Sequence, residues 1–248
     1  MPRLWRVLCL SAALLALAVF AISCGSAGTS YRIINAIANY PYQSTGGMDI
    51  TMNGSLEFSA VQFTNINPPG KDAYQSVASG SDALDVYAKG DSINGGQPFL
   101  SSEVNFNGRT QYTILLMGNN LQNPYAAQPF TDNNAVPTTG NFEFRVIDAS
   151  NNLGTQQLDI YIVGSVQLVT SGQATANATI VFGQATPYIA EAGNGSTPWF
   201  LVVTQHSLRT PILTASYEPN ALQIRTILLL DGPNGAGVGQ PFMYNDLN

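Results

Sequence analysis

The chain has 248 residues and a formal net charge of −6, with 9 Lys and Arg against 15 Asp and Glu. An acidic balance of this kind argues against nucleic acid and anionic lipid surfaces as partners. Only 10% of the residues are charged whereas 45% are hydrophobic, so the chain can form a large core and is not a disordered tether.

The first residues have the layout of an export signal. Arg3 and Arg6 precede an apolar stretch from 7 to 22, and small residues surround Cys24 in Ala21-Ile22-Ser23-Cys24-Gly25. The stretch is shorter than the about 20 apolar residues that a membrane span needs. The sequence therefore predicts export from the cytoplasm.

Residues 21–25 resemble a bacterial lipoprotein signal. The resemblance implies cleavage before Cys24, removal of residues 1–23, and acyl chains on the sulfur and the new amino group of Cys24. Several acyl chains suffice for stable membrane anchoring. Gly25 after the cysteine resembles cargo of the outer membrane in bacteria that have two membranes. The alternatives are an uncleaved anchor helix and an ordinary cleavable signal.

Removal of Arg3 and Arg6 takes the net charge from −6 to −8 and leaves one cysteine, which the lipid would occupy. Packing and sheet hydrogen bonds must then hold the fold without a disulfide. Residues 24–30 are interpreted as the acylated cysteine with a short tether. Because that tether is short, we expect the first domain to lie close to the lipid surface and the second farther out.

The chain contains an internal repeat of about 113 residues. Arg32-Ile33-Ile34-Asn35-Ala36 returns as Arg145-Val146-Ile147-Asp148-Ala149. Three further matches keep the same order and nearly the same spacing, namely Met48-Asp49-Ile50 with Leu158-Asp159-Ile160, 112–117 with 225–230, and Gln128-Pro129-Phe130 with Gln240-Pro241-Phe242. A period of this length predicts two complete domains, so a fragment from Gly140 to Asn248 should fold alone.

Each copy consists of short β-branched or aromatic segments separated by Gly, Pro, Asn and Asp. About seven such segments per copy predict an all-β protein with two tandem immunoglobulin-like or transthyretin-like antiparallel β-sandwiches. The boundaries are residues 31–131 for the first domain, 132–141 for the linker and 142–248 for the second domain. The apolar runs 113–117 and 227–230 are typical of central strands covered on both faces.

The last strand of each domain should contain Gln128-Pro129-Phe130 or Gln240-Pro241-Phe242. Each proline is expected at a strand start or on a sheet edge, with the phenylalanine facing inward.

The repeat units resemble a family known as domain of unknown function 4397, found in exported bacterial proteins and often in tandem. The resemblance rests on the opening Arg32 and Arg145 motifs, the Asp-aliphatic strands at Asp49-Ile50 and Asp159-Ile160, and the Tyr112-Thr113 strand before Gly118. It implies a fold and an exported location rather than a mechanism.

The residue types present disfavour catalysis and metal binding. His206 is the single histidine, and neighbouring Ser207 would point to the opposite face of a strand. Zinc needs several His or Cys ligands. Oxygen-rich turns at 91–94, 132–134 and 231–234 could in principle bind calcium, but they lack the spacing of a dedicated loop. We therefore predict no enzyme activity, no metal and no cofactor.

Aromatic residues in polar loops are candidate ligand contacts. Tyr40 and Tyr42 flank Pro41, Tyr125 follows Pro124, and Trp199 follows Pro198. Rings beside prolines are partly preorganised and could stack on sugars. For Trp199 the alternative is a place in the core beside 200–203.

These observations predict an extracytoplasmic, lipid-anchored cell-envelope protein that displays non-catalytic binding or adhesion modules. A carbohydrate-binding module and a structural spacer in an envelope assembly are the alternatives. The expected partners are the membrane, through the covalent lipid, and a glycan or an envelope protein.

Overall fold

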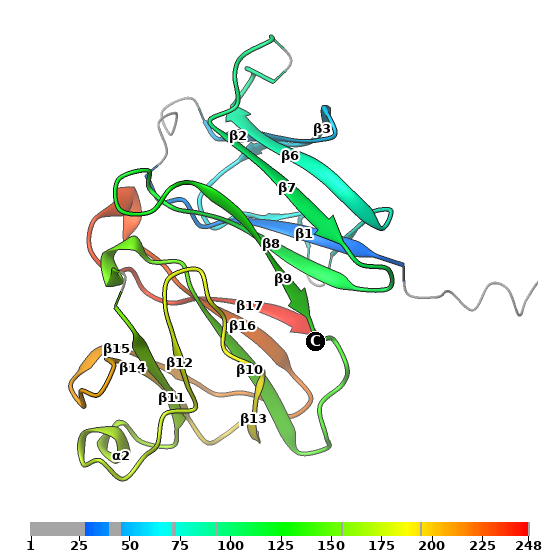
Figure 1. Ribbon diagram of the computed structural model, residues 1–248. Helices are drawn as coiled ribbons and strands as arrows, with labels where there is room; N and C mark the ends of the chain where they lie inside the picture. The colour runs from blue at the N-terminus through cyan, green and yellow to red at the C-terminus, as the bar shows by residue number, and fades with distance from the viewer. Residues whose placement is uncertain are drawn as a thin grey trace, which may run out of the picture.

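The computed structural model describes residues 28–39, 46–70, 73–92, 94–154, 156–193 and 195–247. Within these residues the chain forms two β-sandwiches that pack against each other, so that four sheets are stacked in layers (Figure 1). Cys24, Tyr40 and Tyr42 lie outside the described residues.

The first repeat contributes an outer and an inner sheet. Outer sheet 1 has the strand order β3-β2-β6-β7, with bounds Ser55–Val61, Met48–Met52, Gly80–Ala88 and Leu100–Phe106. Inner sheet 1 has the order β4-β1-β8-β9, with bounds Ile66–Asn67, Ser30–Asn35, Gln111–Met117 and Ala126–Asp132, and β5 (Gln75–Ser76) also pairs with β1.

The second repeat has the same arrangement. Inner sheet 2 has the order β13-β10-β16-β17, with bounds Ile189–Ala192, Asn141–Asp148, Ile224–Leu229 and Phe242–Leu247. Outer sheet 2 has the order β12-β11-β14-β15, with bounds Ala178–Ile180, Leu158–Val163, Trp199–Gln205 and Pro211–Tyr217. Helix α2 (Val166–Thr170) and the 3₁₀ turns η2 (Asn151–Leu153) and η3 (Pro233–Gly235) complete the elements.

The prediction of two β-sandwiches is confirmed, with one addition. In each repeat the first strand pairs in parallel with the strand that follows the outer sheet, β1 with β8 and β10 with β16. The other strand pairs are antiparallel. The parallel pairs place Arg32 beside Thr113 and Arg145 beside Thr226.

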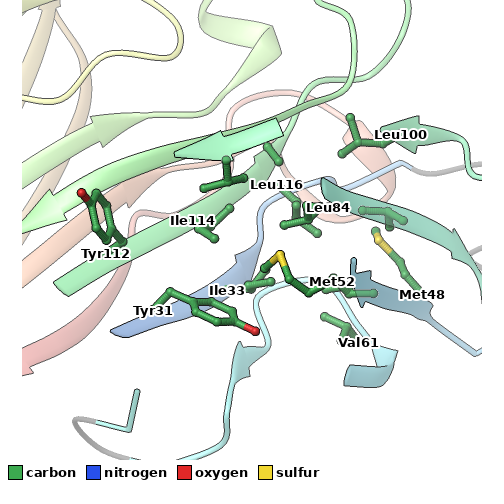
Figure 2. Packing of buried hydrophobic residues seen from close by; sticks show 14 of the residues in the cluster. Tyr31, Ile33, Met48, Met52, Val61, Leu84, Leu100, Tyr112, Ile114 and Leu116 are labelled. Atoms are coloured by element: carbon green, nitrogen blue, oxygen red, sulfur yellow. The ribbon is translucent and has the colours of Figure 1, made fainter. Parts of the chain in front are cut away.

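Each repeat has its own core between its inner and outer sheets. In the first, Tyr31 and Ile33 of β1 meet Met48 and Met52 of β2, and all four are at most 6% exposed (Figure 2). In the second, Phe142 and Phe144 of β10 pack in the same way against outer sheet 2. The far face of outer sheet 2 carries a smaller cluster, in which Val169 of α2 packs with Tyr161 of β11.

A third apolar layer joins the two inner sheets. Successive residues of a strand point to opposite faces, so Ile33 enters the first core while Ile34 faces the second repeat. Ile34, Leu115, Ile147 and Leu228 are each 0% exposed in this layer. The runs 113–117 and 227–230 are therefore apolar throughout because both faces of these strands are covered, as the sequence indicated.

The last strands of the two repeats do not align as the two Gln-Pro-Phe sequences suggested. Pro129 lies in β9 at the edge of its sheet, and β17 begins at Phe242, directly after Pro241. Phe130 and Phe242 pack on the layer between the repeats rather than on their own cores. By strand register Phe130 stands opposite Thr113 as Tyr244 stands opposite Thr226, so Tyr244 rather than Phe242 is the counterpart of Phe130.

Candidate functional site

The arginines that open the two repeats lie in the layer between the inner sheets. Arg32 is the third residue of β1 and Arg145 the fifth of β10, and their exposed fractions are 1% and 3%. Each occupies the strand face opposite its own core. A buried guanidinium must find hydrogen-bond partners and a counter-charge, since desolvation alone would be costly.

Each arginine finds its counter-charge in the other repeat. Arg145 donates from Nη2 to Asp132 Oδ1 at 2.6 Å and from Nη1 to the Thr131 carbonyl at 2.9 Å. Arg32 reciprocally donates from Nη2 to Asp246 Oδ1, and from Nη1 to the Asn245 carbonyl at 3.0 Å. The aspartate at the end of β9 thus pairs with the arginine of the second repeat, and the aspartate at the end of β17 pairs with the arginine of the first.

In each repeat one threonine connects the arginine to the carboxylate of the same repeat. Thr113 Oγ1 accepts from Arg32 Nε at 2.9 Å and donates to Asp132 Oδ2 at 2.7 Å. Thr226 Oγ1 accepts from Arg145 Nε at 3.1 Å and donates to Asp246 Oδ2 at 2.7 Å. We call these six residues the inter-repeat charge cluster: Arg32, Thr113, Asp132, Arg145, Thr226 and Asp246.

Tyrosines complete the surroundings of the inter-repeat charge cluster. Tyr74 donates to Asp132 at 2.8 Å and Tyr188 to Asp246 at 3.2 Å. The guanidinium of Arg32 lies 4.4 Å from the ring centroid of Tyr244. Burial, reinforced by Asp132, raises the pKa of Tyr74, so its hydroxyl remains a donor. The cluster is a closed network that fixes the relative position of the repeats.

The sequence pointed to only half of this network. The sequence repeat identifies Arg32 and Arg145 as a motif, whereas it predicts that Asp132 begins the linker 132–141. Asp132 is instead the last residue of β9. A usable signal existed, because Asp246 follows Asp132 at nearly the repeat spacing, but it was hidden by the misaligned Gln-Pro-Phe match.

The reciprocal ion pairs predict the oligomeric state of the second repeat when it is expressed alone. We expect the fragment Gly140–Asn248 to fold around its own core and to dimerise, because its inner sheet would expose Ile147, Leu228 and Arg145. In a symmetric dimer Arg145 of one copy can meet Asp246 of the other, as Arg32 does in the intact chain. Light scattering after gel filtration would test this, with Asp246→Asn in the fragment as the weakening control. A fragment that is stable and monomeric at high concentration would contradict the expectation.

The second family motif stabilises turns. Asp49 Oδ1 accepts from Ser59 Oγ at 2.6 Å, and Oδ2 accepts from the backbone N–H of Gly90 at 2.7 Å. Asp159 accepts from Thr179 Oγ1 at 2.7 Å and from the N–H of Ser207 at 3.1 Å. Burial acts to raise the pKa of each carboxyl, but the hydrogen bonds outweigh it and lower the pKa.

His206 is part of the second of these turns. Its Nδ1 lies 2.8 Å from Asp159 Oδ1. The neighbouring Ser207 has φ of 66° and uses its backbone N–H for the same carboxylate. The described contacts of His206 thus orient it toward a turn-stabilising aspartate.

A buried carboxyl pair lies at the other end of β10. Asp148 is 0% and Asp231 4% exposed. Asp231 accepts from Ser150 Oγ at 2.7 Å and from Asn151 Nδ2 at 2.9 Å. Asp148 Oδ1 accepts from the Ser150 N–H at 3.1 Å, while its Oδ2 has no hydrogen-bond partner. Burial, with a smaller contribution from Asp231, raises the pKa of Asp148 to about 7.

The two described aromatic candidates lie apart, in different cores. Tyr125 packs edge to face on Phe99, with ring centroids 5.4 Å apart, and its hydroxyl donates to the Asn39 carbonyl at 3.4 Å. Trp199 packs on Phe142 at 5.8 Å, and its Nε1 donates to the Ala192 carbonyl at 2.9 Å. Both are half-buried.

Two shallow pockets lie at the surface where the two repeats meet. One of about 320 Å³ is lined by Arg32, Ile66, Phe242 and Tyr244, and one of about 310 Å³ by Phe63, Leu230, Pro233 and Phe242. Both are at the lower end of ligand-pocket volumes. Among the described residues no three His, Cys, Asp or Glu side chains form a group that could hold a metal ion. No helix in this part of the chain is long and apolar enough to cross a membrane.

The fold and this network define a two-repeat β-sandwich protein whose repeat motifs are structural. The model of the family named domain of unknown function (DUF4397) matches residues 30–161, which run from β1 into β11. The chain belongs to this family.

No curated protein matches the chain, and nine chains of solved structures do. One belongs to a study of alpha-glucan binding by a streptococcal virulence factor, with 10% identity, coverage of 88% of this chain and 97% of that chain, and a TM-score of 0.26. A TM-score this low does not bear on the function of the present chain.

Proposed function

We propose that this protein is a bacterial lipoprotein, anchored through acylated Cys24 on the outer side of a membrane, whose two repeats act together as one non-catalytic display module of the cell envelope. The observation that carries the proposal is how few residues separate Cys24 in the sequence from the first buried residue of the fold. Cys24 ends an export signal, and only four small residues, Gly25-Ser26-Ala27-Gly28, separate it from Thr29. Thr29 is already buried and hydrogen-bonded within the fold.

The inter-repeat charge cluster supports a module rather than two separately moving domains. Polar networks that are fully paired hold packed surfaces in one arrangement. A stiff body on a short tether suits a spacer or a surface that presents a partner-binding face. The partner is a glycan or an envelope protein. In a bacterium with two membranes, Gly25 behind the cysteine favours the outer membrane over the inner one.

Lipid attachment is tested with the two cysteines of the chain. Cys24→Ser should abolish incorporation of labelled palmitate and release or misprocess the protein, because the acylated sulfur is lost. Cys9→Ser provides the matched control, since Cys9 lies within the predicted signal, and it should leave labelling intact. Unchanged labelling of Cys24→Ser would refute the anchor.

A further inference from the structure

We infer that the mature protein stands on the lipid surface with both repeats side by side, touching it through one pole that contains Trp199. This inference rests on the proposed lipid anchor. The anchor-side pole comprises the chain around the starts of β1 and β10, and its marker residues are Thr29, Val136, Trp199 and Leu222.

The first step is that β1 and β10 run in the same direction. Arg32, near the start of β1, bonds to the end of β17, and Arg145, in the middle of β10, bonds to the end of β9. Beyond their ends, Asn123 Nδ2, in the loop after β8, donates to Asn151 Oδ1 at 3.0 Å. Figure 1 shows the two inner sheets aligned in this sense. The starts of both repeats therefore belong to one pole of the molecule.

The second step is the reach of the tether. Thr29 Oγ1 donates to the Asn107 carbonyl at 3.1 Å and accepts from the Arg109 N–H at 3.0 Å. The chain is thus held from Thr29 onward. From Cys24 to Thr29 the chain makes five residue steps, which span at most about 18 Å when fully extended. The lipid must enter the bilayer within that distance of the anchor-side pole.

The third step is the chemistry of that pole in the second repeat. Trp199 contacts Phe142 near the start of β10, and the Leu222 N–H donates to the Asn141 carbonyl at 2.6 Å. Val136 is 63% and Leu222 37% exposed. A half-buried tryptophan packed on Phe142 is suited to the headgroup level of a membrane, where its ring is apolar on one side and wet on the other.

The charge of the pole selects the lipid. Glu191 and Glu218 lie beside this surface, next to Phe142 in register and next to Tyr217 in sequence. Glu143, near the start of β10, adds a third negative charge, while Arg109 in the turn before β8 and Arg225, opposite Phe144 in register, add two positive charges. The surface therefore favours zwitterionic over anionic headgroups. The expectation of a second domain farther from the lipid gives way to a lateral arrangement, because the repeats pack face to face rather than end to end.

Trp199 itself reports on the contact. The chain has two tryptophans, and Trp5 lies in the segment removed before Cys24. The lipidated protein in zwitterionic vesicles should lose Trp199 emission when the lipids carry a quencher near the headgroup, and lose less when the quencher lies deep in the acyl chains. The unlipidated Cys24→Ser protein should show little loss with the same vesicles.

A second probe at the far pole provides the matched control. Leu121 is 86% exposed in the loop after β8. In a chain carrying Trp199→Phe, which keeps an aromatic ring on Phe142, the substitution Leu121→Trp should give emission that these lipids do not quench. Circular dichroism verifies that this double variant folds.

The outcomes separate the inference from the anchor. If the lipidated protein sediments with vesicles but Trp199 is not quenched, the anchor stands and the lateral arrangement is wrong. Quenching at position 121 without quenching at Trp199 would likewise overturn it by reversing the poles. If the lipidated preparation does not sediment with vesicles at all, the anchor itself fails.

Discussion

Replacing Arg145 by Met should lower the free energy of unfolding by roughly 3–5 kcal/mol, the range for removing one partner of a buried ion pair. The change removes the cation that lies 2.6 Å from Asp132 Oδ1 and leaves this buried carboxylate only the longer ion pair with Arg32 Nη2, 3.8 Å from Oδ2. Urea denaturation of the soluble chain that starts at Gly25 gives the measurement, provided that both repeats unfold in one transition.

Two further variants distinguish charge burial from lost packing. Arg145→Met combined with Asp132→Leu should recover part of the loss, because no uncompensated charge remains. Arg109→Met removes an exposed arginine in a turn and should change the stability little. An Arg145→Met protein as stable as the parent would mean that the inter-repeat charge cluster does not hold the repeats together.

The stability of the protein should fall as the pH rises from 5 to 8, and Asp148→Asn should reduce that fall, the remainder coming from groups such as Asp246, whose pKa burial also raises. The pKa of Asp148 is raised from an ordinary 3.8 to about 7 in the folded chain. The folded state therefore holds this proton more tightly than the unfolded state. The resulting stabilisation is complete below about pH 4 and is lost through pH 7, with an upper bound near 4 kcal/mol at about 1.4 kcal/mol per pKa unit.

The first repeat shows that the substitution fits. Asn35 holds the position of Asp148, and its Oδ1 accepts from the Ile37 N–H at 2.9 Å as Asp148 Oδ1 does from Ser150. Asp148→Asn should then be more stable than the parent at pH 8. Denaturation at both pH values checks this, with the exposed acid in Glu103→Gln as the comparison. A parent protein equally stable at pH 5 and pH 8 would contradict the buried-carboxyl explanation.

The sequence predicted the layers within each repeat but not the layer between them. Periodicity identifies which strands are buried on both faces, and 113–117 and 227–230 were assigned in that way. It does not say what covers the second face. The answer depends on Arg32 and Arg145 pairing with aspartates more than 200 residues and 13 residues away, respectively, and no local pattern records such long-range exchange.

Candidate ligand residues were harder to evaluate than the strands. A ring beside proline, such as Tyr125 or Trp199, has the same sequence pattern whether it faces solvent or leans on a neighbour. Only tertiary packing distinguishes these cases, as the contacts of Trp199 with Phe142 and the Ala192 carbonyl illustrate. The Asp49 and Asp159 motifs were recognised as family features, yet their role in stabilising turns required the positions of Gly90 and Ser207.

The reciprocal pairing of the inner sheets limits how the chain could grow by duplication. A head-to-tail interface can add units indefinitely, whereas a two-fold one is complete once two units have met. Here the inner face of each repeat is already occupied by the other. A third copy appended to the chain would find no free inner face to pack on. Its own arginine would then lack an aspartate from another repeat, whether that arginine were buried or exposed. Repeats of this kind are therefore expected to occur in pairs. A substitution on the inner face of one repeat must also fit the inner face of the other.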